Sequence, residues 1–251
     1  MSTEEVRQRA ILERLARMQA PGASLEDVIP SGFTALDELL GGGFPRAQMV
    51  EIFGPSGCGK TTLAIQCVAA IQKQSLTAAW LDADHTFDAA YAERLGVDIG
   101  NLPVAQPASA EQAFEITRTL VGSGAIDLVV VDSAAALVPQ LELDAGIGED
   151  APGLHSRVLA SLLHRLSPTL KRSSACVLFL NQMRNRSGAS AGEAQTSAGG
   201  VPLKLFAAVR ILMTPAPGAR VTLKTRKNKV AECAAERSME RRRDQGFLQS
   251  P

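Results

Sequence analysis

The chain has 251 residues, of which 45% are apolar, and its 26 basic side chains balance 26 acidic ones. This size and composition predict a globular protein with one sizeable core. The longest apolar runs are strand-length and the N-terminus is polar, so we expect neither a membrane span nor a signal peptide. The four cysteines lack metal-ligand or disulfide spacing, which favours a cytoplasmic protein without structural zinc.

Residues 3–19 have the pattern of an amphipathic helix. Ser2 and Glu5 can form a capping box at its start, and Ile11, Leu15 and Met18 form a narrow apolar stripe. Two interpretations stay open for this helix. It either packs or frays as a leader on its own domain, or it serves as a contact element for a neighbouring subunit. We assign residues 1–28 to this helix and a linker.

From residue 29 to residue 230, strand and helix patterns alternate. Strands are predicted at 49–53, 78–82, 102–105, 127–132, 175–181, 207–213 and 220–225, and helices near 60–74, 88–95, 109–122 and 153–171. This alternation predicts an α/β fold with a mostly parallel, twisted sheet and helices on both faces. Because the last two strands follow each other closely, we expect an antiparallel edge.

A complete G-x-x-x-x-G-K-[ST] motif stands between the first of these buried strands and its helix. The motif and the residue after it are Gly54, Pro55, Ser56, Gly57, Cys58, Gly59, Lys60, Thr61 and Thr62. Glycines let backbone N–H groups turn around phosphate oxygens, and the helix N-terminus adds its positive dipole end. We expect Lys60 to reach the β- and γ-phosphates and Thr61 to ligate Mg²⁺. The sequence therefore predicts a nucleoside triphosphate site.

Polar side chains end three other predicted strands. Asp132 follows an apolar run, as a Walker B acid that holds Mg²⁺ through water does. Asp82 and Asp84 end a second strand, and one of them can orient the attacking water. Asn181 and Gln182 end a third, where an amide can sense the γ-phosphate. The alternative for this last pair is simple capping of the strand.

With these motifs in this order, the chain resembles the bacterial RecA recombinases over residues 29–230. The matching stretches are 31–37, 50–52, 54–55, 82–85, 91–92, 95–99, 129–137, 181–182, 199–200 and 227–229. The resemblance implies a RecA-like ATPase core with ATP and Mg²⁺ as cofactors. It also implies binding to single-stranded DNA, assembly with other copies of the chain as a filament or ring, and a role in homologous recombination and DNA repair.

The same resemblance implies roles for individual residues. Lys60, Thr61 and Thr62 match the phosphate and magnesium contacts of the family, Asp132 its Walker B acid and Gln182 its γ-phosphate sensor. Tyr91 matches the aromatic residue that stacks on adenine, with Asp88 close to the base, which favours ATP over GTP.

Two further sets of residues match contacts that the family makes outside its own nucleotide pocket. Lys227 and Lys229 match lysines that reach the γ-phosphate of an adjacent subunit, whereas as a bare charge cluster they would be a solvated turn. The DNA-binding loops correspond to residues 144–153 and 183–200. Their candidate DNA contacts are Arg157, Arg184, Arg186, Gly199 and Gly200.

The chain departs from the family pattern in four places. Asp84 stands where the family has a glutamate, so we expect slower hydrolysis because the side chain is one methylene shorter. The second loop has Ala191 in place of an aromatic residue, and the first has Pro152 beside the acidic pair 149–150. Residues 231–251 form a short basic tail in place of the family's carboxy-terminal domain. We expect this tail to be disordered, with an electrostatic contact as the alternative.

The leading interpretation is a DNA-dependent ATPase of RecA type. A second is an ATP-binding accessory protein of the DNA-damage response, with weak hydrolysis, that joins or regulates a recombinase or translesion polymerase complex. A third is a regulatory ATPase that never contacts DNA. Other DNA-repair proteins are expected partners in the second case.

Overall fold

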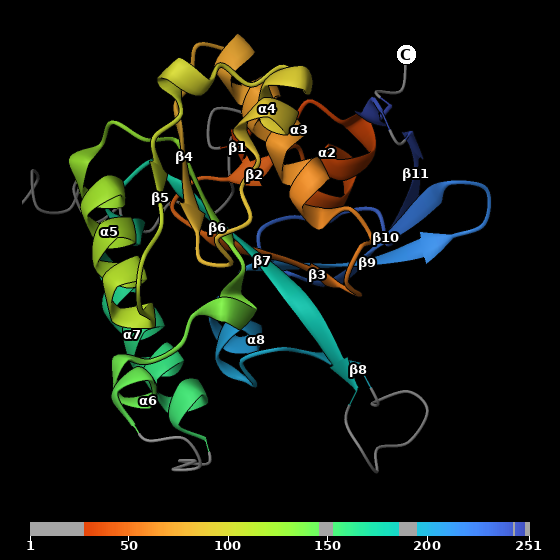
Figure 1. The fold of residues 1–251 in the computed structure, drawn as a ribbon. Helices are drawn as coiled ribbons and strands as arrows, with labels where there is room; N and C mark the ends of the chain where they lie inside the picture. The colour runs from red at the N-terminus through yellow and green to blue at the C-terminus, as the bar shows by residue number, and fades with distance from the viewer. Residues whose placement is uncertain (1–27, 146–152, 186–194, 243, 249–251) are drawn as a thin grey trace, which may run out of the picture.

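The computed structural model describes residues 28–145, 153–185, 195–242 and 244–248 (Figure 1). Within these ranges the chain forms a ten-stranded sheet in the order β12-β11-β10-β9-β3-β7-β6-β4-β5, with β8 attached to β7. Its strands are β3 (Met49–Gly54), β4 (Ala78–Asp82), β5 (Val104–Ala105), β6 (Leu128–Asp132), β7 (Cys176–Asn185), β8 (Gln195–Ser197), β9 (Val209–Ala216), β10 (Arg220–Asn228), β11 (Glu236–Arg242) and β12 (Gly246–Phe247). A separate small sheet pairs β1 (Val28–Ile29) with β2 (Phe44–Pro45).

The sheet has a parallel part and an antiparallel part. From β9 to β5 neighbouring strands pair in parallel, whereas β9, β10, β11 and β12 pair in antiparallel fashion. Side chains alternate between the two faces of the sheet. Val130 and Leu178 join one buried cluster, and Val129, Val131 and Phe179 join the other. The predicted α/β fold, with a parallel sheet between two layers and an antiparallel edge, is confirmed.

Helices cover both faces (Figure 1). They are α2 (Thr34–Leu40), α3 (Lys60–Lys73), α4 (Ala89–Arg94), α5 (Ala110–Ser123), α6 (Gln140–Asp144), α7 (Leu154–Lys171) and α8 (Pro202–Phe206). The four predicted helices are present within a residue of their expected bounds. The short helices α2, α6 and α8 were not predicted, because an apolar stripe barely repeats within five to seven residues; of the described helices of this length, only α4 was predicted. Among the described helices, none is both long and apolar enough to cross a membrane.

The expectation of a disordered tail after residue 230 is wrong for most of that segment. Residues 236–242 form β11, which pairs with β10 from Arg220–Glu240 to Lys224–Glu236, and residues 246–247 form β12. Met239 is only 4% exposed, and Phe247 is 2% exposed in the same cluster as α3. Two isolated apolar residues in a highly charged segment do not form a recognisable strand pattern. The sequence also does not show that the edge of β10 is open for pairing.

The second predicted DNA-binding loop, residues 183–200, forms strands at both of its ends. β7 continues to Asn185 and pairs with β8, with Met183 opposite Ser197. Residues 186–194, between these two strands, lie outside the described residues, as do residues 146–152 of the first loop and the predicted helix at 3–19.

Candidate nucleotide-binding site

The phosphate-loop motif joins β3 to α3. α3 begins at Lys60, and Gly59 before it has φ 102°, in the left-handed region where a side chain is disfavoured. Lys60 is 8% exposed, and its Nζ donates to the carbonyl oxygens of Gly54, at 3.1 Å, and Pro55, at 2.8 Å. The ammonium group is thus buried over the loop with neutral acceptors, which a phosphate can replace.

Asp132 ends β6 beside the first turn of α3. Its Oδ2 accepts a 2.8 Å hydrogen bond from Thr61 Oγ1. Burial raises the pKa of Asp132 from 3.8 to about 6, and the negative charges of Asp84 and Asp82 add to this effect. The Thr61 hydroxyl and the Asp132 carboxylate fit a Mg²⁺ site. Mg²⁺ commonly takes one or two protein oxygens and completes its shell with phosphate and water.

The structure separates the two carboxylates after β4 into different roles. Asp82 is 1% exposed, and its oxygens accept from the backbone N–H groups of Thr86 and Phe87 and from Gln106 Nε2. Asp84 lines the nucleotide pocket, and its Oδ1 accepts from Ser133 Oγ at 3.2 Å. Asp82 therefore holds the turn after β4, and Asp84 is the carboxylate that can act on a ligand.

The two amides where β7 stops pairing with β3 also differ. Asn181 is fully buried, and its Nδ2 donates to Glu51 Oε1 at 2.8 Å and to the Ala198 carbonyl at 3.0 Å. Gln182 pairs in register with Gly54 and lines the pocket. Asn181 therefore has a structural role, in line with the alternative of strand capping. Of these two amides, only Gln182 is placed to contact a nucleotide.

These groups enclose one pocket with a volume of about 350 Å³. The phosphate loop forms one wall, and Asp84, Asp132 and Gln182 form the other. The register explains this convergence, because Gly54 lies opposite Gln182 and Asp82 lies opposite Asp132, so the carboxyl ends of neighbouring parallel strands meet at one edge.

Tyr91 lies beside this pocket, on α4. Its hydroxyl is 3.2 Å from Thr62 Oγ1, and the guanidinium of Arg94 lies 5.5 Å from the centre of its ring. Asp88 caps α4, because its side chain accepts from the Tyr91 N–H at 2.9 Å. The predicted base-binding pair is thus held next to the phosphate loop by a hydrogen bond and a helix cap.

Comparison with known proteins matches residues 11–241 to the RecA N-terminal domain. The chain is 45% identical over 215 residues to protein RecA of Symbiobacterium thermophilum and 46% identical over 215 residues to that of Roseiflexus castenholzii, which covers 82% of this chain and 61% of each relative. It is 48% identical to protein RecA of Acidiphilium cryptum over 186 residues, or 74% of this chain and 54% of that relative. The chain belongs to the RecA family. It spans about three fifths of the length of the first two relatives.

The two lysines that the RecA resemblance singled out lie far from the pocket of their own chain. Lys227 is level with Arg210 in the sheet, and Lys229 N donates to the carbonyl of Ala208, whose own N–H donates to Met49. Lys229 is thus level with the start of β3, five residues or about 17 Å from Gly54. The structure does not bring these lysines together with the phosphate loop.

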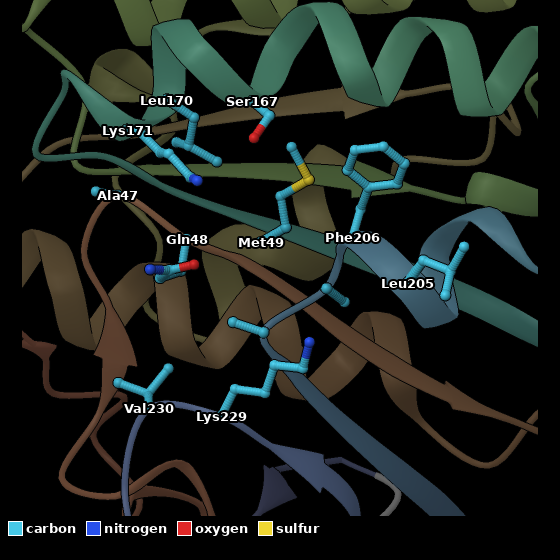
Figure 2. A pocket seen from close by; sticks show the side chains of 12 residues that line it. Ala47, Gln48, Met49, Ser167, Leu170, Lys171, Leu205, Phe206, Lys229 and Val230 are labelled. Atoms are coloured by element: carbon cyan, nitrogen blue, oxygen red, sulfur yellow. The ribbon is translucent and has the colours of Figure 1, made fainter.

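Lys229 borders a different hollow, of about 420 Å³, beside α8 (Figure 2). Lys229 lines it together with Met49, Leu170 and Phe206. Lys227 Nζ donates to the carbonyls of Lys204 and Leu205 at 2.7 and 3.0 Å. Burial, with the nearby positive charges of Lys229 and Arg210, lowers the pKa of Lys227.

The described parts of the predicted RecA DNA loops come together at the start of α7. Arg157 is exposed in the first turn of that helix. Gly199 and Gly200 have φ values of 78° and 79° and pack against Leu159 and Ser156, where a Cβ would approach side-chain atoms to 3.0 Å. Arg184 lies in β7, in register with Thr196. Arg186 falls outside the described residues.

Arg241 lines the nucleotide pocket and was missed by the sequence analysis, which placed it in a disordered tail. Its Nη1 donates to the carbonyl oxygen of Gly57 at 3.1 Å. One signal was available in the sequence. Met239 is an isolated apolar residue in a polar segment, and in a strand Arg241 shares its face.

Proposed function

We propose that this RecA-family protein is an ATP hydrolase that assembles on single-stranded DNA and acts in homologous recombination and DNA repair. The observation that carries this proposal is the pocket in which the phosphate loop faces Asp84, Asp132 and Gln182, at the edge where the parallel pairing of neighbouring strands ends. Membership of the RecA family supports ATP as the ligand and assembly on single-stranded DNA.

Phosphoryl transfer needs positioning and charge stabilisation more than covalent chemistry. Lys60 exchanges its two carbonyl acceptors for phosphate oxygens, and the N–H groups at residues 57–62 surround the β-phosphate. Thr61 and Asp132 would hold Mg²⁺, which would supply positive charge to the transferring phosphate. Asp84 orients the attacking water and accepts its proton, while the Ser133 hydroxyl fixes the orientation of this carboxylate.

The base is held on the other side of Thr62. Tyr91 stacks on the adenine ring, and its hydroxyl contact to Thr62 sets the position of the ring next to the phosphate loop. Asp88 lies near the base, although its side chain also caps α4. This arrangement supports ATP as the nucleotide.

Lys227 and Lys229 complete the site of a neighbouring copy. They project at the opposite end of the strands from their own phosphate loop, so they serve hydrolysis only where subunits stack head to tail. The lowered pKa of Lys227 reflects a cation that is partly desolvated before the neighbour docks. Hydrolysis then depends on assembly, as with an arginine finger supplied in trans.

DNA binding couples to this pocket through the β7–β8 hairpin. The Ala198 N–H donates to the carbonyl of Gln182, and Asn181 donates to the carbonyl of Ala198. A shift of Gln182 toward a γ-phosphate therefore moves the base of the second loop. Arg157, Arg184 and Arg186 contact DNA phosphates, and Gly199 and Gly200 act as the hinge.

The test is ATP hydrolysis by the full chain with and without single-stranded DNA, together with DNA binding at two salt concentrations. We expect DNA to stimulate hydrolysis, and the affinity for DNA to fall steeply as salt rises, because phosphate contacts release counterions. Arg157→Gln should weaken DNA binding, and Arg172→Gln, which removes an exposed arginine just after the other end of α7, should leave it unchanged.

Hydrolysis without stimulation, combined with salt-insensitive DNA binding, would reject the recombinase. Tight ATP binding with almost no turnover on any DNA would instead favour an accessory role in complexes with other DNA-repair proteins.

A further inference from the structure

The C-terminal strand pair places a basic residue at the nucleotide pocket. Arg241 belongs to β11, which lies on the far side of β3 from β6 and β7, so it reaches the phosphate loop from the side opposite Asp132 and Gln182. Its guanidinium packs directly on Gly59. A Cβ at that glycine would lie 2.8 Å from Arg241 Nη1 and 3.2 Å from Arg241 Cδ. The absence of a side chain at Gly59 therefore lets Arg241 approach the phosphate loop closely.

Arg241 differs from the other arginines of its strand that the structure describes. Arg237 forms an ion pair with Glu38, and Arg242 forms one with Glu240 at 3.3 Å. Within the described ranges, Arg241 has no carboxylate partner, and its side chain makes one hydrogen bond, to the neutral carbonyl of Gly57. A guanidinium carries five N–H donors, so most of its donors remain for another ligand.

The element that presents Arg241 is fixed to the helix of the phosphate loop. Phe247, paired with Arg241 across β11 and β12, is 2% exposed. Its N–H donates to Gln66 Oε1 at 2.7 Å, and its carbonyl accepts from Gln66 Nε2 at 3.1 Å. Gln66 lies in the second turn of α3, about one turn after the motif. The guanidinium is thus held in place before any ligand arrives, which lowers the entropy cost of using it in binding.

We propose that Arg241 is a nucleotide-binding residue that contacts the α- and β-phosphates, the part common to ATP and ADP. It does so in the same chain, from a strand separate from the motif. Asp84, Asp132 and Gln182 face the γ-phosphate and metal side of the pocket, whereas Arg241 faces Gly57 and Gly59 of the loop itself. This inference rests on the proposed nucleotide site and adds a charged contact to it.

The test measures binding of ADP, inorganic pyrophosphate and adenosine to the full chain and to Arg241→Gln by calorimetry or competition. A hydrogen bond to a charged group predicts a loss of about 10- to 100-fold in affinity for ADP and pyrophosphate, with adenosine unchanged. In hydrolysis, the KM for ATP should rise by a similar factor with little change in kcat, since the contact exists equally in the ground state and the transition state.

The matched control is Arg242→Gln. It removes the same charge from the next position of β11, where the side chain is exposed and does not line the pocket, and it should leave all three affinities unchanged. Arg241→Lys keeps the charge but loses the fork of donors, and should give an intermediate loss for ADP. If Arg241→Gln does not fold, the lysine variant provides the comparison.

An unchanged affinity for ADP in Arg241→Gln, with a lower melting temperature, would make Arg241 a purely structural clamp on Gly57 and overturn the inference. An equal loss for adenosine would also overturn it, because the contact would then be with the base. If the unaltered chain binds neither ADP nor ATP, the proposed nucleotide site itself is wrong. The two failures are therefore distinguishable.

Discussion

In the parallel part of the sheet, charged and amide side chains gather at neighbouring strand ends, whereas the antiparallel part sends its basic residues to opposite edges. Gly54 and Asp132 end two parallel strands, Gln182 is the last residue of β7 that pairs in parallel with β3, and the three meet in one pocket. In the antiparallel part, β10 carries Lys227 away from that pocket, and β11 brings Arg241 back to it.

The reason is strand direction. Parallel strands place all their carboxyl ends at one edge, so residues distant in sequence converge there. Antiparallel strands alternate in direction, so each successive strand ends at the opposite edge of the sheet. The first part is therefore suited to a site within one chain, and the second can also supply groups to a neighbour.

The largest expected effect concerns the parallel part. Lys60→Ala should lower ATP hydrolysis by about 10²–10³-fold, because the protein loses the buried cation that stabilises the negative charge on the phosphates during transfer. Steady-state hydrolysis and ATP binding measure this. Lys73→Ala, which removes an exposed lysine from the last turn of the same helix, should leave both unchanged. Normal hydrolysis in Lys60→Ala would contradict the site.

The next prediction tests whether the antiparallel part acts on a neighbour. Lys227→Ala should lower hydrolysis by about 10²-fold while ATP binding by the single chain persists. An equimolar mixture of Lys60→Ala and Lys227→Ala chains should recover part of the activity. In a randomly mixed assembly, about a quarter of the head-to-tail contacts join a chain with an intact phosphate loop to a neighbour with an intact Lys227, and only these contacts form a complete site. Lys224→Ala, on the exposed part of β10 in an ion pair with Glu236, is the control. A mixture without recovery would reject the trans role.

Asp132 predicts a pH effect in the parallel part. Its folded pKa of about 6 exceeds its usual value of 3.8, so between these values the folded chain retains a proton that the unfolded chain releases. Stability contributed by this group falls as pH rises through that window. Asp132→Asn should therefore raise the free energy of unfolding of the nucleotide-free, magnesium-free protein by about 1–3 kcal/mol at pH 7.5 and by little at pH 4.

Urea unfolding at the two pH values measures this difference. Glu93→Gln, at an exposed carboxylate on α4, should show no such pH-dependent gain. A gain of equal size for Asp132→Asn at both pH values would show that the burial of a charge at Asp132 is not its cause.

The smallest expected effect concerns Asp84. Asp84→Glu should raise turnover at saturating ATP and DNA by about 10-fold, because the longer side chain brings the carboxylate closer to the attacking water. Asp84→Asn, which removes the carboxylate, gives the turnover expected without a general base at this position. If Asp84→Glu loses activity, the pocket is instead built around aspartate and its contact with Ser133.

The phosphate loop could be predicted from the sequence alone, because its chemistry depends on consecutive backbone N–H groups and on glycines at fixed spacing. The parallel strands and the three long helices α3, α5 and α7 were predictable for a similar reason, since their apolar patterns repeat within a short stretch of chain. The family resemblance added Tyr91 and the pair Lys227 and Lys229 as candidates, without indicating where these lysines lie.

Only the tertiary structure decided the remaining points, because they depend on which distant segments pair. Hydrogen bonds from Thr86, Phe87 and Gln106 make Asp82 a structural residue and leave Asp84 to face the pocket. Pairing of β11 with β10 turned an apparently disordered basic tail into part of the sheet and brought Arg241 to the phosphate loop. Arg241 and Gly57 are 184 positions apart, so their contact leaves no local trace in the sequence.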